Sequence, residues 1–333
     1  MEWLFIEWVG KPIWMWTAFL TVVALLLAFD LGVLNKTDKE LGIAESLRLS
    51  AFYIAIAMLY GGGIWWAYEA GQITTADGTH AGLTYFTGFF IEKALSIDNV
   101  FVISLIFTFF AIPRKYQYRA LVWGIIAVIV LRGIMIGVGA ALVQEYEWVL
   151  YIFGAFLIAT GIKMLVVPES DPDVSKNPVV KFMRARMRVT DQLHDQKFFV
   201  RQPDPATGKM VTWATPLFLA LVIINAADLI FAVDSVPAIF AITTDTFIVY
   251  TANIMAILGL RALYFALAAM VHRFHYLKYA LALVLVFIGG KIFWNQIFGK
   301  VNPAISLGVT LALIAGGIFY SLWKTRQQAH PAS

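Results

Sequence analysis

The chain has 333 residues, of which 60% are hydrophobic and only 14% are charged, and its formal net charge is +4 at pH 7. This composition is typical of integral membrane proteins and excludes an ordinary soluble domain. The modest positive charge indicates cytoplasmic loops that meet anionic lipid rather than a nucleic-acid-binding surface, and the absence of cysteine excludes disulfides and zinc-thiolate sites.

Apolar runs of about 20 residues recur along the chain, and each can cross a hydrocarbon core of about 30 Å as a helix. The sequence predicts an all-α protein with about nine such spans. In chain order they are residues 13–34, 49–68, 85–112, 120–143, 148–167, 213–242, 247–271, 279–297 and 304–323. The first run is too long for the core of a signal peptide, so we expect it to be retained.

The distribution of lysine and arginine predicts the orientation, because these residues gather in cytoplasmic loops. With nine spans, nearly all basic loop residues fall on one side of the membrane, and the other side has only Lys11 and Lys300. The sequence therefore predicts an N-terminus outside the cell and a C-terminus in the cytoplasm.

An internal repeat is visible in the third and sixth spans. The segment EKALSIDNV, residues 92–100, recurs as DLIFAVDSV, residues 228–236, so that the carboxylates of Glu92 and Asp98 align with those of Asp228 and Asp234. Residues 124–132 align with 253–261, and residues 161–163 with 289–291. Because the repeating unit has three spans, its second copy is inverted in the membrane, as in many secondary transporters.

This repeat predicts one membrane domain. Its parts are N-terminal helices at 13–83, repeat 1 at 85–167, a cytoplasmic loop at 168–212, repeat 2 at 213–297 and a C-terminal helix at 304–323.

The four repeated carboxylates need compensation, since each ionised residue at a helix centre costs about 2.5–3.5 kcal/mol and four cost on the order of 10 kcal/mol. One explanation is structural ion pairs with the five basic residues inside the predicted spans, which are Lys93, Arg132, Lys163, Arg261 and Lys291. The other is a cation site. The two are compatible, because basic partners can hold the carboxylates while no cation is bound.

Geometry limits how a cation site can form, because residues six apart on a regular helix point about 120° apart. Glu92 and Asp98 reach one ion only if the helix is discontinuous. In the second copy Pro237 predicts such a break beside Asp234, and broken helices expose backbone oxygens to cations.

Oxygen ligands dominate the candidate site, since the histidines lie in loops or tails. The candidate metal ligands are Glu92, Asp98, Asn99, Asn225, Asp228, Asp234 and Ser235. Carboxylate, amide and carbonyl oxygens suit Mn²⁺, Mg²⁺ or Ca²⁺ rather than zinc or copper. Asp30, near the inner end of the first span, is either a gate or extra ligand or an aspartate satisfied by nearby backbone.

Three stretches carry a resemblance to a known family. They are IEKALSIDNVFV, DLIFAVDSVPAIFAITTDTFIVYTANIMAILGLRALYF and FIGGKIF. The chain resembles the TerC family of membrane proteins, in its Alx-like branch, from about Trp14 to Trp323. The resemblance implies a manganese exporter of the bacterial inner membrane, with the acidic motif residues at Glu92, Asp98, Asp228 and Asp234. Relatives usually carry Glu where this chain has Asn225, which removes a negative charge.

The first functional hypothesis is therefore Mn²⁺ export by alternating access, with Mn²⁺ as transported substrate, no organic cofactor, and Ca²⁺ or Mg²⁺ as other candidate ions. Export against a negative-inside potential suggests coupling to protons or sodium, with Glu92 or Asp228 as candidate proton carrier. The alternative is a metal-responsive membrane sensor or scaffold linked to metal, tellurite or redox stress. An enzyme is not expected, because no nucleophile with a base and no cofactor motif is visible in the spans.

The loop at 168–212 has two recognisable parts. Residues 181–188 place Phe182, Met183 and Met187 among basic residues, which predicts a helix lying on anionic lipid. The stretch FFVRQPDPATGKMVTW predicts a hairpin with its turn in DPATGK. A plain solvated connector is the alternative, and a regulatory role is a hypothesis that rests on the length of the loop.

Overall fold

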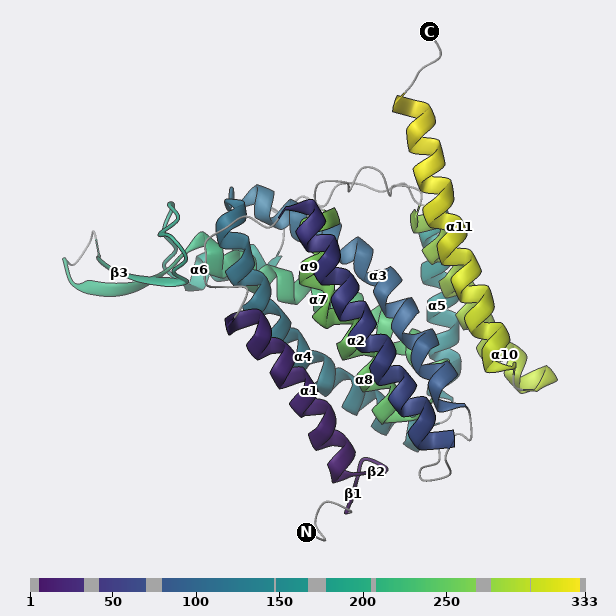
Figure 1. The fold of residues 1–333 in the computed structure, drawn as a ribbon. Coiled ribbons are helices and arrows are strands. Elements are labelled where there is room, and N and C mark those ends of the chain that lie inside the picture. The colour runs from purple at the N-terminus through teal and green to yellow at the C-terminus, as the bar shows by residue number, and fades with distance from the viewer. Residues whose placement is uncertain are drawn as a thin grey trace.

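The computed structural model describes residues 6–32, 42–69, 80–146, 148–166, 178–204, 208–267, 277–299 and 301–329, and for residues 31, 32, 98 and 325–329 it describes the backbone alone. Helices dominate these ranges (Figure 1). In chain order the elements are β1 (Glu7–Trp8), β2 (Lys11–Pro12), α1 (Ile13–Gly32), α2 (Ile43–Glu69), α3 (Ala81–Phe109), α4 (Arg114–Glu145), α5 (Val149–Val166), α6 (Pro178–Arg186), β3 (Phe199–Pro203), β4 (Met210–Ala214), α7 (Pro216–Phe240), α8 (Thr246–Leu258), α9 (Leu260–Leu267), α10 (Leu277–Phe298) and α11 (Pro303–Ala329).

The chain is an all-α, multi-pass integral membrane protein. Among the described residues, eight helices are long and apolar enough to cross a membrane. They are α1, α2, α4, α5, α7, the pair α8 and α9, α10 and α11. The remaining predicted span, 85–112, is third in chain order and coincides with α3, which is 29 residues long but contains Glu92, Lys93 and Asp98. Helix α3 lies against α2, α7, α8 and α11, so protein rather than lipid surrounds much of it.

The predicted breaks beside the aspartates are wrong. Helix α3 runs unbroken past Asp98, and α7 runs unbroken past Asp234 to Phe240. Pro237 lies in the last turn of α7, so it removes the hydrogen bond to the carbonyl oxygen of Val233 near the end of the helix, and only residues 238–240 follow it.

The discontinuity lies instead in the seventh predicted span, where α8 ends at Leu258 and α9 begins at Leu260. Lys93 Nζ donates a hydrogen bond of 3.2 Å to the carbonyl oxygen of Ala256 at this point. A Cβ atom on Gly259 would lie 2.9 Å from Lys93 Nζ and 3.0 Å from Tyr53 Cβ, so a larger residue there would require Lys93 and Tyr53 to shift. The part of this span beyond residue 267 lies outside the described residues.

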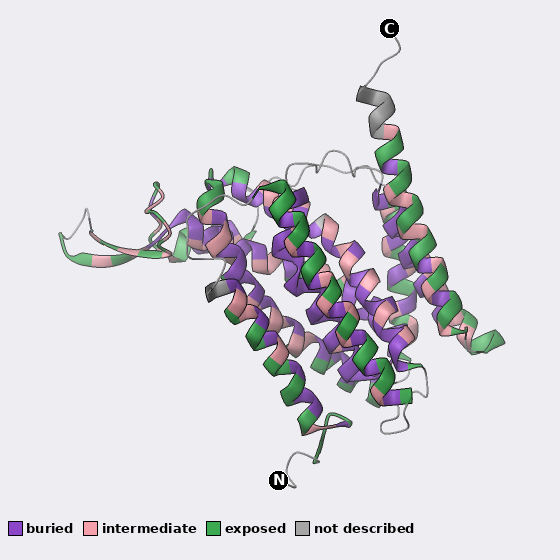
Figure 2. Ribbon diagram, viewed as in Figure 1, coloured by how far each residue is buried: buried purple, intermediate pink, exposed green. Residues whose placement is uncertain are grey.

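Helices α8 and α9 form the centre of the bundle. In the most apolar 18-residue stretch of residues 246–267, 89% of the residues are buried, whereas in that of residues 303–324 in α11 only 17% are buried. Figure 2 shows the same distribution, with buried residues in the interior and exposed residues on the outer faces of α1, α2 and α11. Large apolar side chains such as Leu59, Trp66 and Phe319 are exposed on these faces, as expected where the solvent is lipid.

Helices α5 and α10 pack backbone against backbone. A Cβ atom on Gly161 would lie 2.7 Å from the carbonyl oxygen of Ala282, and one on Gly289 would lie 2.6 Å from that of Gly154. The contact therefore runs antiparallel and depends on small residues at both crossing points, as is common between membrane helices.

The segment between α5 and α7 is partly as predicted. Strands β3 and β4 form the expected antiparallel hairpin, with Phe199 opposite Ala214 and Pro203 opposite Met210. Helix α6 differs from the prediction, because Met183 is buried against the bundle together with Val180, while Phe182 is exposed. The lipid-binding role remains a prediction for Phe182 alone, since Met183 already packs on protein.

Candidate polar site at the centre of the bundle

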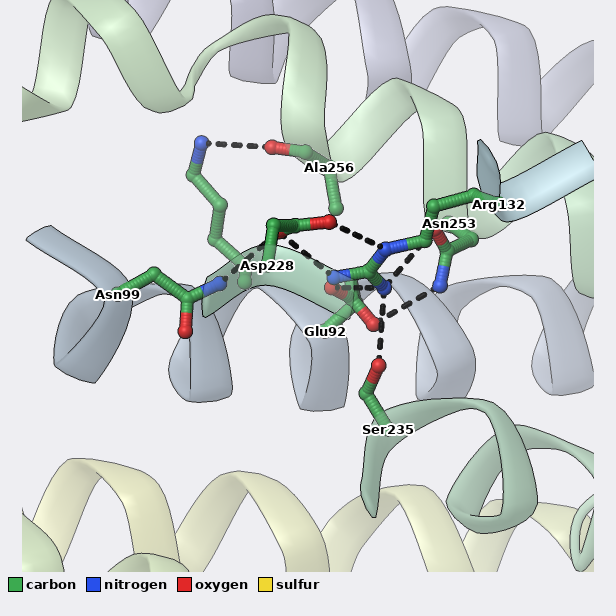
Figure 3. A network of polar contacts seen from close by, with 8 residues as sticks. Glu92, Asn99, Arg132, Asp228, Ser235, Asn253 and Ala256 are labelled. Carbon is green, nitrogen blue, oxygen red and sulfur yellow. Dashed lines mark hydrogen bonds and ion pairs between the residues drawn. The ribbon is translucent and has the colours of Figure 1, made fainter. Parts of the chain in front are cut away.

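Arg132 on α4 occupies the centre of a buried polar network (Figure 3). Its Nη1 donates to Glu92 Oε1 of α3 at 2.7 Å, while its Nε and Nη2 each donate to Asp228 of α7 at 3.1 Å. The Asp228 carboxylate is thus held by two parallel bonds, the strongest geometry that arginine offers a carboxylate.

Three neutral side chains complete the network. Arg132 Nη1 also donates to Ser235 Oγ at 2.9 Å and to Asn253 Oδ1 at 3.2 Å, and the amide of Asn253 donates to Glu92 Oε2 at 2.9 Å. On the other side, Asn99 Nδ2 donates to Asp228 Oδ1 at 3.4 Å. Helices α3, α4, α7 and α8 therefore all contribute to one hydrogen-bonded group (Figure 3).

The network is almost completely shielded from solvent. Glu92 and Arg132 are each 1% exposed and Asp228 is 8% exposed. Burying such charges is expensive unless they are paired and hydrogen-bonded, and here one guanidinium compensates two carboxylates. With both carboxylates ionised, the network would carry an excess of one negative charge and would attract a further positive charge.

The chemistry of the network is that of a cation site with an arginine in it. Carboxylate, amide and hydroxyl oxygens of four side chains point at one positive group, and this donor set suits Mn²⁺, Mg²⁺ and Ca²⁺. No three His, Asp or Glu side chains among the described residues lie close enough together to hold a metal ion. A cation can use these oxygens only if the guanidinium of Arg132 moves away.

The structure brings together four of the seven predicted ligands: Glu92, Asn99, Asp228 and Ser235. Asp234 lies elsewhere, half-buried and facing α5, where Thr160 Oγ1 donates to its Oδ1 at 3.4 Å. The side chain of Asp98 lies outside the described part of the chain. The predicted pairing of Glu92 with Asp98, and of Asp228 with Asp234, on one ion therefore has no support in the described geometry, because the helices do not break.

Asn225 also stays apart from the network. Its Nδ2 donates to the carbonyl oxygen of Leu221 at 2.7 Å, one turn earlier on α7. Its Oδ1 is buried and has no hydrogen-bond partner within the described ranges. An unpaired buried oxygen is costly unless a donor or a cation reaches it.

Of the five basic residues in the predicted spans, Arg132 and Arg261 pair with carboxylates. Lys93 binds the carbonyl oxygen of Ala256, Lys291 Nζ lies 3.3 Å from Ser306 Oγ between α10 and α11, and Lys163 is exposed on α5. Among the contacts described here, ion pairs with carboxylates are therefore seen for Arg132 and Arg261.

Asp30 is held by side chains, which differs from one of its two predicted alternatives, satisfaction by nearby backbone. Its Oδ1 accepts hydrogen bonds from Arg261 Nη2 and from the hydroxyl of Tyr53. The hydroxyl of Tyr118 donates to the backbone carbonyl of Asp30 at 2.6 Å, and its ring lies 4.4 Å from Arg261 Cζ. These contacts attach the end of α1 to α2, α4 and α9.

A cavity lies between the Arg132 network and the Asp30 contacts. Its polar lining consists of Asn99, Asp228 and Arg261, and the rest is apolar. The centre of a water-sized sphere has about 30 Å³ in which to move there. Since about 10–15 Å³ suffices for one water molecule, the cavity can hold a water molecule or a small ion.

Sequence reasoning missed Asn253 and the buried ion pair between Lys11 and Asp245. Asn253 is an isolated amide in the apolar run TANIMAIL, which was the available signal. Lys11 Nζ lies 2.9 Å from Asp245 Oδ2, and Asp245 also caps α8 by accepting from the backbone of Phe247 and Ile248. The capping position of Asp245 is readable in TTDTF, but its pairing with Lys11, more than 200 residues earlier in the chain, is not.

Comparison with known proteins agrees with this architecture. Residues 77–329 match the family described as integral membrane protein TerC family. A protein of Rickettsia bellii named "Uncharacterized membrane protein" is 47% identical over 92% of this chain and 96% of its own length. A protein of Escherichia coli named "Putative membrane-bound redox modulator Alx" is 40% identical over 95% of this chain and 96% of its own length, and one of the same name from Photorhabdus laumondii is 39% identical over 96% and 98%.

No solved structure matches the chain. The family match covers most of the chain and includes Glu92, Arg132, Asp228 and Asn253, so the network lies inside the shared region. The chain belongs to the TerC family of integral membrane proteins.

Proposed function

We propose that this protein transports a divalent cation across the bacterial cytoplasmic membrane, with Mn²⁺ export as the activity. The observation that carries the proposal is the convergence of Glu92, Asp228, Ser235 and Asn253 on one buried positive charge. A static protein gains little from such a group, since hydrophobic replacement of buried ion pairs is often neutral or stabilising.

In this proposal Arg132 holds the site between transport events. The arginine neutralises one of two negative charges, whereas a divalent cation in its place neutralises both. Exchange of the guanidinium for Mn²⁺ is therefore electrostatically favourable once the ion has lost part of its hydration shell. The arginine prevents Glu92 and Asp228 from remaining as two bare carboxylates after the ion leaves.

Alternating access requires two halves that move against each other, and an inverted repeat of three spans supplies them. The proposed repeat relates α3 to α7, α4 to α8 and α9, and α5 to α10. Two features support it. Helix α3 packs on α8 as α7 packs on α4. In the α5–α10 contact, the alignment that matches Gly161 with Gly289 also matches Gly154 with Ala282, and each of these positions touches the other's counterpart.

Export is the demanding direction, because a divalent cation leaving a negative-inside cell opposes about 4.6 kcal/mol per 100 mV. Exchange for protons or sodium ions would supply this free energy. Glu92 and Asp228 are the candidate proton carriers, since each is a buried carboxylate in the network.

The direct test is Mn²⁺ flux into proteoliposomes, with Ca²⁺ and Mg²⁺ as competitors and imposed pH or sodium gradients. Glu92→Gln and Asp228→Asn should each abolish flux, because each removes one charge from the site. Asp191→Asn, which changes an exposed carboxylate outside the bundle, should leave flux unchanged. Native flux that survives both network substitutions would refute the proposed site.

A metal-responsive sensor remains the second candidate, and the name of the Alx relatives, which refers to redox modulation, favours it. In this case the network binds Mn²⁺ only to set the state of the segment that contains α6, β3 and β4. Saturable Mn²⁺ binding to the purified protein, with no flux above that of empty liposomes, would favour the sensor over the transporter.

A further inference from the structure

Arg132 and Arg261 occupy equivalent positions in the two proposed repeats but have different partners. The alignment of residues 124–132 with 253–261 places these two arginines opposite each other. Arg132 binds Glu92 and Asp228, whereas Arg261 binds Asp30 of α1, which lies outside both repeats. The two repeats therefore differ in the partners of their equivalent arginines.

The cavity is the counterpart of the Arg132 network. The repeat aligns Glu92 with Asp228, Ser235 with Asn99, and Asn253 with Gly124. Asp228, Asn99 and Gly124 all line the cavity, and so does Arg261 itself. Applying the repeat to the Arg132 network therefore predicts the guanidinium of Arg261 at this point, bound to Asp228 and Asn99. In the structure the predicted position of the guanidinium is instead the cavity.

Arg261 is incompletely satisfied where it lies. Its side chain is 0% exposed, and one terminal nitrogen binds Asp30. Its Nε and Nη1 are buried and have no hydrogen-bond partner among the described residues. The ring of Tyr118 lies 4.4 Å from Arg261 Cζ. Unpaired donors beside a cavity with a carboxylate in its wall give Arg261 a second place to bind.

We propose that Arg132 and Arg261 alternate as the internal cation of Asp228. In the state described here Arg132 binds Asp228, and Asp30 retains Arg261. In the second state Arg261 leaves Asp30, enters the cavity and donates to Asp228 and Asn99, while Arg132 withdraws. The inference rests on the proposed transport cycle, in which this exchange opens each half-site in turn to Mn²⁺, with Asp30 as the residue that selects the state.

Thiol labelling tests the exchange without any transport. The native chain has no cysteine, so Val128→Cys places a unique thiol in the cavity wall. Its reaction with methyl methanethiosulfonate is followed by mass spectrometry in purified protein. Asp30→Asn should slow labelling at least fivefold, because Arg261 loses its carboxylate and moves into the cavity. Adding Arg261→Met to Asp30→Asn should restore the original rate.

Labelling that is unchanged or faster with Asp30→Asn would overturn the exchange, as would slow labelling that persists with Arg261→Met. A double-mutant cycle is the second test. It applies if the thiol introduced by Val128→Cys does not react in any of these variants. Among the described residues, Asp30 and Asp228 share no hydrogen-bond or ion-pair partner. If Arg261 stays in place, the fall in unfolding temperature caused by Asp30→Asn should therefore add to the fall caused by Asp228→Asn.

If Arg261 moves to Asp228, the double variant must lose more than the sum of the single falls. Additive falls would overturn the exchange. Both measurements are made without Mn²⁺ flux, so a protein that exchanges its arginines but moves no ion would refute the transporter and leave the exchange standing.

Discussion

Replacing Arg132 by Met gives the sharpest test of how the network is held. The substitution keeps a long apolar side chain but leaves Glu92 and Asp228 buried without their shared counter-charge. Removing one partner of a buried ion pair typically costs about 3–5 kcal/mol. Since Arg132 serves two carboxylates, we expect a loss of free energy of unfolding in or above this range.

Mn²⁺ should recover much of that loss, because the variant presents two carboxylates and two neutral oxygens with no guanidinium among them. A ligand at 100 times its dissociation constant stabilises the folded state by about 2.7 kcal/mol. In the native protein the ion must first displace Arg132, so its stabilising effect should be smaller. Mn²⁺ should therefore raise the unfolding temperature of Arg132→Met more than that of the native chain.

The assay is thermal unfolding in detergent, followed by the fluorescence of the 11 tryptophans, with either a chelator or MnCl₂ present. Arg201→Met, which changes an exposed arginine on β3, is the matched control and should unfold as the native protein does. Arg132→Met that is as stable as the native chain in chelator, or equal stabilisation of both by Mn²⁺, would contradict the reasoning.

Three further predictions concern packing and charge. Gly289→Ala should destabilise the protein by about 1–3 kcal/mol, because the new Cβ would lie 2.6 Å from the carbonyl oxygen of Gly154. Gly290→Ala is the control, since a Cβ there meets nothing within 4 Å. Equal unfolding temperatures of the two variants would show that α5 and α10 separate easily. Met183→Ala should lower the free energy of unfolding by about 2–4 kcal/mol and Phe182→Ala by much less, because Met183 is 5% exposed and Phe182 is 62% exposed. If Phe182→Ala is the more destabilising variant, α6 does not pack on the bundle in solution. Asn225→Glu should raise Mn²⁺ affinity, measured by isothermal titration calorimetry, because it adds a carboxylate on the same helix as Asp228; unchanged affinity would exclude position 225 from the cation path.

The helices and the important charges could be predicted because both depend on local composition. Length and apolarity alone identify the spanning helices, and Glu92 and Asp228 are conspicuous in apolar surroundings. The position of the helix break could not be predicted, since Pro237 and Gly259 are both helix breakers and only tertiary contacts decide between them. Pro237 is harmless in a terminal turn, whereas Gly259 has the ammonium of Lys93 against it.

The second feature that the sequence could not predict is which side chains the buried polar residues bind. Arg132 and Arg261 sit in similar local contexts, yet one lies between two carboxylates and the other pairs with Asp30, more than 200 residues earlier in the chain. Asn253 gave no stronger signal than any other isolated amide, although it binds both Glu92 and Arg132. Such pairings depend on how the helices cross, which composition does not encode.

The contact between α5 and α10 has a consequence for how such a chain is built. On the proposed repeat, Gly154 faces the counterpart of Gly161, and Gly161 faces the counterpart of Gly154. The patch formed by these two glycines is therefore complementary to its own counterpart at Ala282 and Gly289. A surface of this kind is isologous. A separate three-helix unit with that patch would bind a second copy of itself inserted in the opposite orientation. The contact between α5 and α10 would then supply the affinity between the halves, and the covalent link through residues 168–212 would only fix their ratio at one to one.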